Sequence, residues 1–287
     1  MLHGLCVVDK PAGMTSHDVV GLLRRRLGER RIGHSGTLDP DATGVLLCGV
    51  GNLTRFLRYL TDLPKTYTAE VVLGSTTNTL DDSGEVTATF DMTGVTVEQA
   101  RALVAEHLTG PIMQVPPMVS AIRIDGKRLH ELAREGIEVD REARPVTVYR
   151  YDVAATEDPL VFAIEVQCSS GTYIRTLAAD LGELLGGGAH VRKLRRTAIG
   201  SFTVAEAAAP DECDVWPMAR GLRDYASVTV DDEQAGMVRH GRSLPRFDGD
   251  GPWVVCDSEG QLLAMFEPDG DMAKPSVVVP EQAEATP

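Results

Sequence analysis

The apolar positions of the chain follow two periods, one typical of helices and one typical of strands. After Ser16, which we expect to be an N-cap, apolar residues recur at the 3–4-residue spacing of a helix face as far as Leu27. The segments 146–154 and 160–168 alternate apolar and polar residues and predict an antiparallel pair of strands. Short apolar runs bounded by turns predict further strands, at 5–9, 45–50 and 65–74.

Capping signals mark the ends of further helices. Thr96 and Gln99 form a capping box, which predicts a helix that ends before Gly110-Pro111, and Asn52 is an expected N-cap for a short helix. Thr172 is an expected N-cap as well, and it places Arg175 in the first turn of the next helix. A cation there opposes the helix dipole, so we expect a carboxylate partner for Arg175.

The composition changes near Glu206. Residues 206–287 hold 17 acidic and 6 basic side chains, whereas residues 1–205 hold 25 and 22. Strand-like runs separated by turns follow from about residue 228. We therefore predict a linker with a short helix over 206–227, a small β-rich domain over 228–280 and a disordered tail over 281–287.

The formal net charge of −14 disfavours nucleic-acid binding, because neutralisation of phosphates drives such binding. The basic residues of the first 205 positions are nevertheless clustered. The clusters are Arg24, Arg25, Arg26, Arg30 and Arg31, and then Arg192, Lys193, Arg195 and Arg196. They indicate either phosphate contact or solvated faces.

Several classes of protein are excluded by absent patterns. The chain has no run of about 18 apolar residues and no signal-peptide pattern, so we expect a cytoplasmic protein without membrane contact. Its five cysteines are scattered without a CxxC spacing, which argues against a disulfide framework and against a metal site. No P-loop or dinucleotide fingerprint occurs, and the triplet Gly186-Gly187-Gly188 follows a helix, so we expect no cofactor.

The stretch from Gly33 to Gly44 is the strongest candidate for chemistry. Its glycines permit backbone angles closed to other residues, and Pro40 forces Asp39 into an extended conformation. A carboxylate on such a constrained backbone suits a group that must meet a substrate at a fixed angle. An ordinary Asx-type turn is the structural alternative.

The full string Gly-His-Ser-Gly-Thr-Leu-Asp-Pro-x-Ala-Thr-Gly resembles the catalytic motif of the bacterial tRNA pseudouridine-55 synthases of the TruB type. Further stretches resemble the same family in order, and they cover about residues 4–204. These are Asp9 to Ser16, Lys65-x-Tyr67, Thr79 to Gly84, Gly171 to Arg175 and Ala189 to Gly200. The resemblance implies an α+β fold, with a pseudouridine synthase catalytic domain over 1–205 and a small PUA-like domain at its C-terminus. The catalytic domain would contain a mixed, mostly antiparallel sheet flanked by helices.

The resemblance also implies roles for individual residues. Asp39 would be the catalytic carboxylate, Arg175 its ion-pair partner and Tyr67 the ring that lies against the target base. His34 would stack in the space that the flipped base leaves, although a histidine in a glycine loop usually bonds to backbone. Substrate contacts would come from the apolar side chain of Leu194 and from cations on phosphate, namely Lys10, Lys127 and Arg196. A solvated surface is an equal alternative for Lys127.

The implied reaction converts one uridine of the tRNA T-loop into its C5-glycoside isomer, without a cofactor or a metal ion. Attack of Asp39 at C1′, addition at C6 and abstraction of a 2′ proton all stay open. The tRNA T-arm is the expected partner of a monomer that needs no protein partner. The alternatives are a guide-RNA-dependent pseudouridine synthase, a tRNA-folding chaperone with secondary catalysis and, least favoured, a glycosidase.

Overall fold

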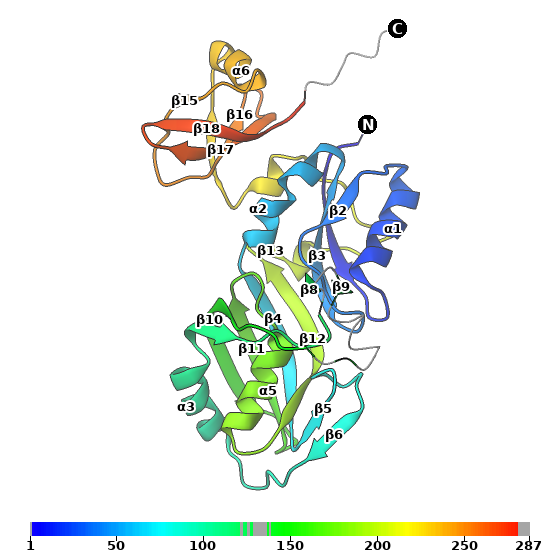
Figure 1. The fold of residues 1–287 in the computed structure, drawn as a ribbon. Helices are drawn as coiled ribbons and strands as arrows, with labels where there is room; N and C mark the ends of the chain where they lie inside the picture. Colours follow the sequence, from blue (N-terminus) through cyan, green and yellow to red (C-terminus); the bar gives the residue numbers. More distant parts are fainter. Residues whose placement is uncertain (1, 121–122, 125–126, 129–136, 138, 281–287) are drawn as a thin grey trace. The chain divides into compact units, whose positions relative to one another are not determined.

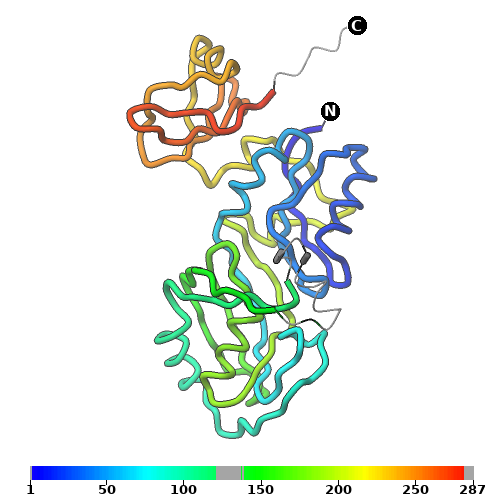
Figure 2. Tube along the Cα trace, in the orientation of Figure 1, coloured from blue at the N-terminus to red at the C-terminus, as the bar shows by residue number. Residues whose placement is uncertain are grey.

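The computed structural model describes residues 2–120, 123–124, 127–128, 137 and 139–280, and the chain forms two compact units (Figures 1 and 2). Unit 1 comprises the described residues of 1–40, 44–62 and 199–287. Unit 2 comprises those of 41–43 and 63–198. Among the described residues, no helix has both the length and the apolar character needed to cross a membrane.

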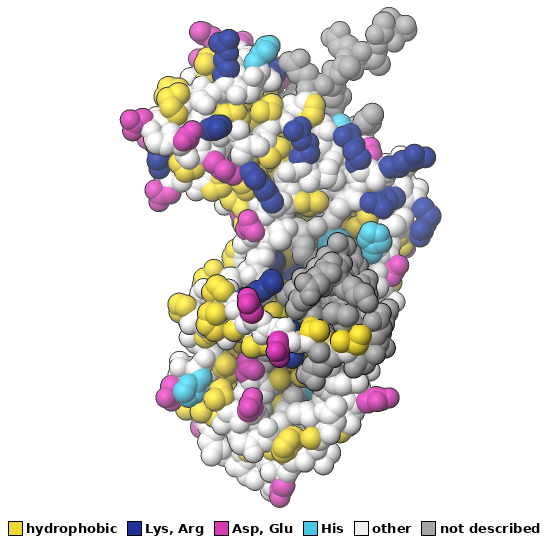
Figure 3. Space-filling view, viewed as in Figure 1, with side chains coloured by type: hydrophobic (Ala, Val, Ile, Leu, Met, Phe, Trp, Pro, Cys, Tyr) yellow, Lys and Arg dark blue, Asp and Glu magenta, His cyan; other side chains and the backbone are white. Residues whose placement is uncertain are grey.

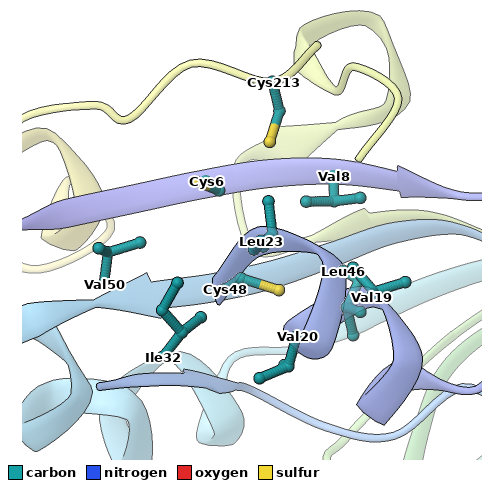
Figure 4. Close-up of a cluster of buried hydrophobic side chains, with 10 residues drawn as sticks. All are labelled: Cys6, Val8, Val19, Val20, Leu23, Ile32, Leu46, Cys48, Val50 and Cys213. Carbon is teal, nitrogen blue, oxygen red and sulfur yellow. The ribbon is translucent and has the colours of Figure 1, made fainter. Parts of the chain in front are cut away.

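The N-terminal part of unit 1 is a small sheet covered by one helix. Strand β3 (Thr43–Val50) pairs antiparallel with β1 (Gly4–Lys10) and with β2 (Ile32–His34). Helix α1 (Ser16–Leu27) packs its apolar stripe on these strands (Figure 4). The predicted helix and the strands predicted at 5–9 and 45–50 are therefore present, and the structure shows that they share one core.

The ends of the helices in unit 1 differ in detail from the sequence expectation. The N-cap of α1 is Thr15, which forms a capping box with Asp18, so Ser16 is the first helical residue. The short helix after β3 is a 3₁₀ turn, η1 (Gly51–Phe56), followed by α2 (Leu57–Asp62). Its N-cap is Val50 without a side-chain bond, so the prediction for Asn52 was wrong.

The C-terminal part of unit 1 is a separate five-stranded sheet with one helix. The strand order is β14 (Ala226–Thr229), β16 (Trp253–Cys256), β17 (Leu262–Asp269), β18 (Met272–Val278) and β15 (Leu244–Pro245). Only the β14–β16 pair is parallel. Helix α6 (Asp232–Arg239) packs over a core in which Trp253 is fully buried. The strands expected in this region are confirmed.

Short elements connect the two sheets of unit 1 along the chain. They are β13 (Phe202–Thr203) and the 3₁₀ turns η2 (Val204–Glu206) and η3 (Arg220–Leu222). The short helix expected between residues 206 and 227 thus takes the form of η3.

Unit 2 is built on five neighbouring strands. Their order is β12 (Ala189–Ile199), β4 (Lys65–Leu73), β11 (Val161–Cys168), β10 (Arg144–Ala155) and β7 (Gly110–Gln114). The pairs β4–β11, β11–β10 and β10–β7 are antiparallel, which confirms the predicted pairing of segments 146–154 and 160–168.

Two helices of unit 2 contact each other and the sheet. Helix α3 (Val97–His107) packs against β10, and α5 (Ile174–Leu184) packs against β4. The capping box at Thr96 and Gln99 is confirmed. The N-cap of α5 is Tyr173 rather than Thr172, but Arg175 lies in the first turn as expected.

Two hairpins complete unit 2, β5 (Ser75–Thr77) with β6 (Val86–Thr89) and β8 (Arg123–Ile124) with β9 (Lys127–Arg128). A helix over 126–136 is a further sequence prediction. It lies outside the described residues apart from Lys127 and Arg128, which form strand β9 instead of the start of a helix.

Candidate active site

The backbone on the N-terminal side of Asp39 is held by one serine. The Leu38 N–H donates to Ser16 Oγ at 2.8 Å, and the Ser16 hydroxyl donates to Leu38 O at 3.2 Å. Both Ser16 and Leu38 are buried, so water does not compete for these bonds. Ser16 is free for this contact because Thr15 caps the helix in its place.

The backbone on the C-terminal side of Asp39 is held by one lysine. Lys10 Nζ donates to Pro40 O at 2.8 Å, and the Gly13 N–H donates to the same oxygen at 3.0 Å. Two further carbonyls, of Pro11 and Met14, also accept from Nζ. The Lys10 side chain is 0% exposed. This geometry favours a positioning role for Lys10 over the phosphate contact predicted from the sequence.

His34 is the last residue of β2, and the Asp39 loop follows it directly. His34 ends β2 opposite Cys48 of β3 and is half-buried, and the next residue, Ser35, donates its N–H to Leu47 O at 3.0 Å. Gly36 and Gly44 have φ angles of 91° and 105°, in the left-handed region that disfavours side chains. The glycines of the motif therefore shape the Asp39 loop, as predicted.

In unit 2, Arg175 is fixed by three oxygen atoms. Its Nη1 donates to Thr79 O and its Nη2 to Val119 O, each at 2.8 Å, while Nε lies 3.8 Å from Asp81 Oδ2. The Arg175 side chain is only 4% exposed. The expected carboxylate near this helix N-terminus is therefore present, and among the contacts described here it is Asp81.

Asp81 is the site residue to which the sequence analysis gave no role. Its Oδ1 accepts from Thr79 Oγ1, from the Ser83 N–H and from Ser83 Oγ, at 2.6–3.1 Å. Leu80 beside it has a φ of 63°, and the bonds that join Leu80 O and Asp82 N to Val191 hold this strained turn on β12. The family-like string from Thr79 to Gly84 was the signal that pointed to this turn.

The N-terminus of α5, which carries Arg175, is itself clamped to β7. Gln114 Oε1 accepts from the Tyr173 N–H at 2.8 Å, and Gln114 Nε2 donates to Tyr173 O at 3.1 Å. Gln114 is 2% exposed, so both hydrogen bonds are shielded from water. The helix therefore begins at a fixed place without a side-chain cap of its own.

The remaining predicted residues of unit 2 lie on strands. Tyr67 is on the buried face of β4, across from Val166 of β11. Leu194 and Arg196 are on β12, where Leu194 is half-buried and Arg196 only 1% exposed. The burial of Arg196 argues against a phosphate contact. Lys127 is on β9, and its side chain lies outside the described part.

The main residues of the candidate site, which are the predicted ones together with Asp81, therefore fall into two groups. Lys10, His34 and Asp39 lie together in unit 1, whereas Tyr67, Arg175 and Asp81 lie in unit 2. The predicted ion pair of Asp39 with Arg175 joins one group to the other and stays a prediction. Within the described part of the chain, no three His, Cys, Asp or Glu side chains gather where they could hold a metal ion.

The basic cluster near the N-terminus lies at the surface of unit 1. The arginines from Arg24 to Arg31 are exposed, and Lys and Arg side chains gather over α1 in the space-filling view (Figure 3). Arg24 also donates to Ile32 O at 2.8 Å, and Arg26 donates to Cys213 O, so these two support the fold. No such bond is described for Arg25 and Arg30.

Comparison with known proteins defines the class. Solved structures of a Cbf5-Nop10-Gar1 complex and of an H/ACA RNP bound to a substrate RNA contain chains similar in fold to this one, with TM-scores of 0.73 and 0.71. The alignments cover 96% of this chain and 84% of each of those chains, at 23% and 21% identity. The fold is therefore the α+β pseudouridine synthase fold followed by a small PUA-like β domain, which confirms the predicted fold class.

Sequence comparison then gives the family. Residues 24–174 match the TruB family pseudouridylate synthase (N terminal domain), 175–216 the tRNA pseudouridylate synthase B C-terminal domain, and 225–280 the tRNA Pseudouridine synthase II, C terminal. The "tRNA pseudouridine synthase B" of Mycobacterium tuberculosis (strain ATCC 25618 / H37Rv) is 43% identical, over 96% of this chain and 95% of the relative. That of Corynebacterium aurimucosum is 46% identical, over 93% of each chain. The chain belongs to the TruB family of pseudouridine synthases.

Proposed function

We propose that this protein is a tRNA pseudouridine-55 synthase, which isomerises one uridine of the T-loop with Asp39 as the catalytic carboxylate. Relatives named for this tRNA modification align with nearly the whole chain. The observation that carries the assignment of Asp39 is its loop, in which Ser16 holds the residue before Asp39 and Lys10 the residue after it. A reactive group is held in this way when its angle to the substrate matters.

Asp39 acts at the glycosidic bond of the target uridine. Cleavage of that bond develops positive charge on the ribose, and a nearby carboxylate stabilises the charge. The detached base rotates and rejoins the ribose through C5, after which the C5 proton leaves. Attack at C1′, addition at C6 and 2′-deprotonation are each compatible with this role of Asp39.

Arg175 keeps Asp39 ionised and aimed. A guanidinium beside a carboxylate lowers the carboxyl pKa, commonly by about 1–3 units, and so opposes the effect of burial. Thr79 O, Val119 O and Asp81 fix the guanidinium of Arg175 before any substrate arrives. We assign Asp81 as a positioning residue that acts through Arg175.

The other site residues bind the nucleotide and its surroundings. Tyr67 stacks on the base and assists loss of the C5 proton, while Leu194 gives the base an apolar contact. His34 fills the space that the flipped uridine leaves in the T-loop. Lys10 acts on the Asp39 loop, and the exposed arginines near α1 and Lys127 meet phosphates of the T-arm.

The proposal extends to the organisation of the protein. It would act in the cytoplasm as a monomer on the T-arm of tRNA, without a protein partner. The predicted boundaries, with a catalytic domain over 1–205, a linker over 206–227 and a PUA-like domain over 228–280, belong to the same proposal. The match of residues 225–280 to the family's C-terminal part supports the last boundary.

Tritium release from tRNA labelled at uracil C5 tests the function. The intact protein should release close to one tritium per tRNA without any guide RNA. Asp39→Asn should abolish release and keep tRNA binding, whereas Asp41→Asn, an exposed neighbour, should leave release unchanged. Binding without release by the intact protein would leave only the chaperone function, and release that depends on an added guide RNA would favour a guide-directed enzyme.

A further inference from the structure

A segment of unit 1 after the catalytic domain is fastened along β1 on both sides of Cys6. Ala208 exchanges backbone bonds with β1, since its N–H donates to Val7 O at 3.1 Å and its carbonyl accepts from the Asp9 N–H at 2.8 Å. Trp216 and Leu5 exchange N–H···O bonds of 2.8 and 3.0 Å. Residues 208–216 therefore bridge a short stretch of β1, and Cys213 lies within the bridge.

The bridge brings two thiols together. The side chains of Cys6 and Cys213 belong to one buried cluster, and each thiol affects the pKa of the other. The Cys213 side chain points toward β1, the strand that carries Cys6 (Figure 4). Both residues are at most 2% exposed. Because the backbone bonds fix both ends of segment 208–216, the two sulfurs are kept close without a covalent link.

A guanidinium lies beside the same pair. Arg26 Nη2 is 3.6 Å from Cys213 Sγ and also donates to Cys213 O. A cation at this place stabilises a thiolate, which is the reactive form of cysteine. The neighbouring Cys6 thiol lowers the pKa of the Cys213 thiol, and the Arg26 charge acts in the same direction, against the effect of burial. The pKa of Cys6 is raised, by the neighbouring Cys213 thiol and by burial, so Cys6 stays protonated.

We propose that Cys6 and Cys213 are a peroxide-sensitive thiol pair, whose oxidation to a disulfide locks segment 208–216 onto β1. A sulfur beside a cation, with a second thiol in the same buried cluster, distinguishes this site from the other cysteines. Cys168 and Cys256 are also buried, and burial raises the pKa of each thiol.

The chemistry needs one molecule of hydrogen peroxide. The Cys213 thiolate attacks one peroxide oxygen, an S–O bond forms, the O–O bond breaks, and the departing hydroxide takes up a proton to become water. The Cys213 sulfur is thereby oxidised to a sulfenic acid while the peroxide is reduced. The Cys6 sulfur then attacks the Cys213 sulfur, the S–O bond breaks, and the hydroxide leaves as water with the Cys6 proton. Two thiols and one peroxide thus give a disulfide and two waters.

The Cys6–Cys213 disulfide would act on the core that supports the Asp39 loop. Strand β1 ends at Lys10, whose ammonium group holds Pro40 O next to Asp39. A cross-link from β1 to segment 208–216 closes a loop of about 200 residues, and such a link restricts the unfolded chain. We therefore expect oxidation to raise the thermal midpoint of unfolding.

Peroxide treatment of the full-length protein tests the proposal. The expected result is loss of two of the five thiols, counted in denaturant, together with a mass lower by two hydrogen atoms. Peptide mapping without reductant should join the peptide of Cys6 to that of Cys213. Dithiothreitol should restore all thiols and return the thermal midpoint to its starting value.

Matched variants separate this pair from its neighbour Cys48, which lies opposite Cys6 across β1 and β3. The Cys48→Ser variant should still lose two thiols, whereas the Cys213→Ser variant should lose none. If Cys213→Ser does not fold, Cys213→Ala is used in its place. Arg26→Gln should form the disulfide several-fold more slowly. A disulfide in Cys213→Ser, a product with added oxygen but no link, or no oxidation of the intact protein would each overturn the proposal.

Discussion

At the scale of single residues, buried polar side chains do the positioning in this protein. Ser16 and Lys10 both lie in the string from Asp9 to Ser16, and both direct their polar atoms at the backbone beside Asp39. A buried backbone group that loses its partner costs about 1–3 kcal/mol. The N-terminal motif therefore acts as a support for the second motif, which carries the carboxylate.

Replacing Ser16 by alanine should lower the single-turnover rate of tritium release by tenfold or more, with tRNA binding nearly unchanged. The buried Leu38 N–H loses its acceptor, and a small displacement of Asp39 is costly because a reacting group misplaced by about 1 Å loses about 100-fold in rate. Thr15→Ala is the matched control. It removes the α1 cap, costs about 1 kcal/mol of stability and should leave the rate unchanged. Equal rates for the two variants would contradict the positioning role of Ser16.

At the scale of elements, the start of α5 depends on a clamp from β7. Gln114→Leu removes both side-chain bonds to Tyr173 and allows the helix N-terminus to shift with Arg175. We expect a lower thermal midpoint and a lower kcat for tritium release. Thr96→Ala, which removes the capping box of α3, should cost about 1 kcal/mol and spare kcat. A normal kcat for the Gln114→Leu variant would contradict the proposed role of Gln114 in positioning α5.

Helix α5 also carries a carboxyl that destabilises the folded protein at neutral pH. Burial raises the pKa of Asp180 to about 6 from an ordinary value of 3.8, and the charge of Glu183 adds to this. The folded state therefore holds this proton to a higher pH than the unfolded state. Stability falls as the pH rises from about 4 to about 6, and the loss is complete above that window.

Asp180→Asn should therefore stabilise the protein by roughly 1–2 kcal/mol at pH 7.5, less than the full shift because Asp180 is partly exposed. The gain should vanish below about pH 4. Urea unfolding at both pH values measures it. Asp91→Asn is the control. Because a hydrogen bond from Thr93 lowers the pKa of Asp91, this substitution should lower the stability at pH 7.5 instead of raising it. A gain for Asp180→Asn that persisted at low pH would show that charge is not its cause.

At the scale of the whole molecule, charge is divided unevenly along the chain. The strong acidity belongs to residues 206–287, while exposed arginines gather near α1. A chain with a net charge of −14 can bind tRNA when such clusters meet the phosphates.

The double variant Arg25→Ala/Arg30→Ala should weaken tRNA binding and reduce the slope of log K against log salt by about 1–2. Neither side chain has a described structural bond, so folding should not change. Titration of binding between about 50 and 200 mM salt gives the slope. Arg242→Ala, in the acidic C-terminal region, is the matched control and should leave the slope unchanged. An unaltered slope in the double variant would mean that this cluster is a solvated face.

The amino-acid sequence by itself determined the features that depend on neighbours in the chain. The glycines and Pro40 predict the Asp39 loop, and the capping box at Thr96 is present as expected. Alternation predicts the pair of strands at 146–154 and 160–168, and short apolar runs predict strands of both units. The resemblance to the TruB family also rests on short strings of adjacent residues. Backbone preferences and short spacings are local properties of the chain, so they can be inferred from the sequence before the fold is known.

Only the tertiary structure decided where the buried polar groups find their partners. Ser16 looked like a helix cap and instead holds Leu38, Lys10 looked like a phosphate ligand and instead holds Pro40, and Arg175 meets Asp81 across 94 positions of sequence. The pairing of Cys6 with Cys213 is of the same kind. Each such contact joins segments that the chain brings together only by folding, because a buried donor or charge takes the acceptor that the packed core offers it.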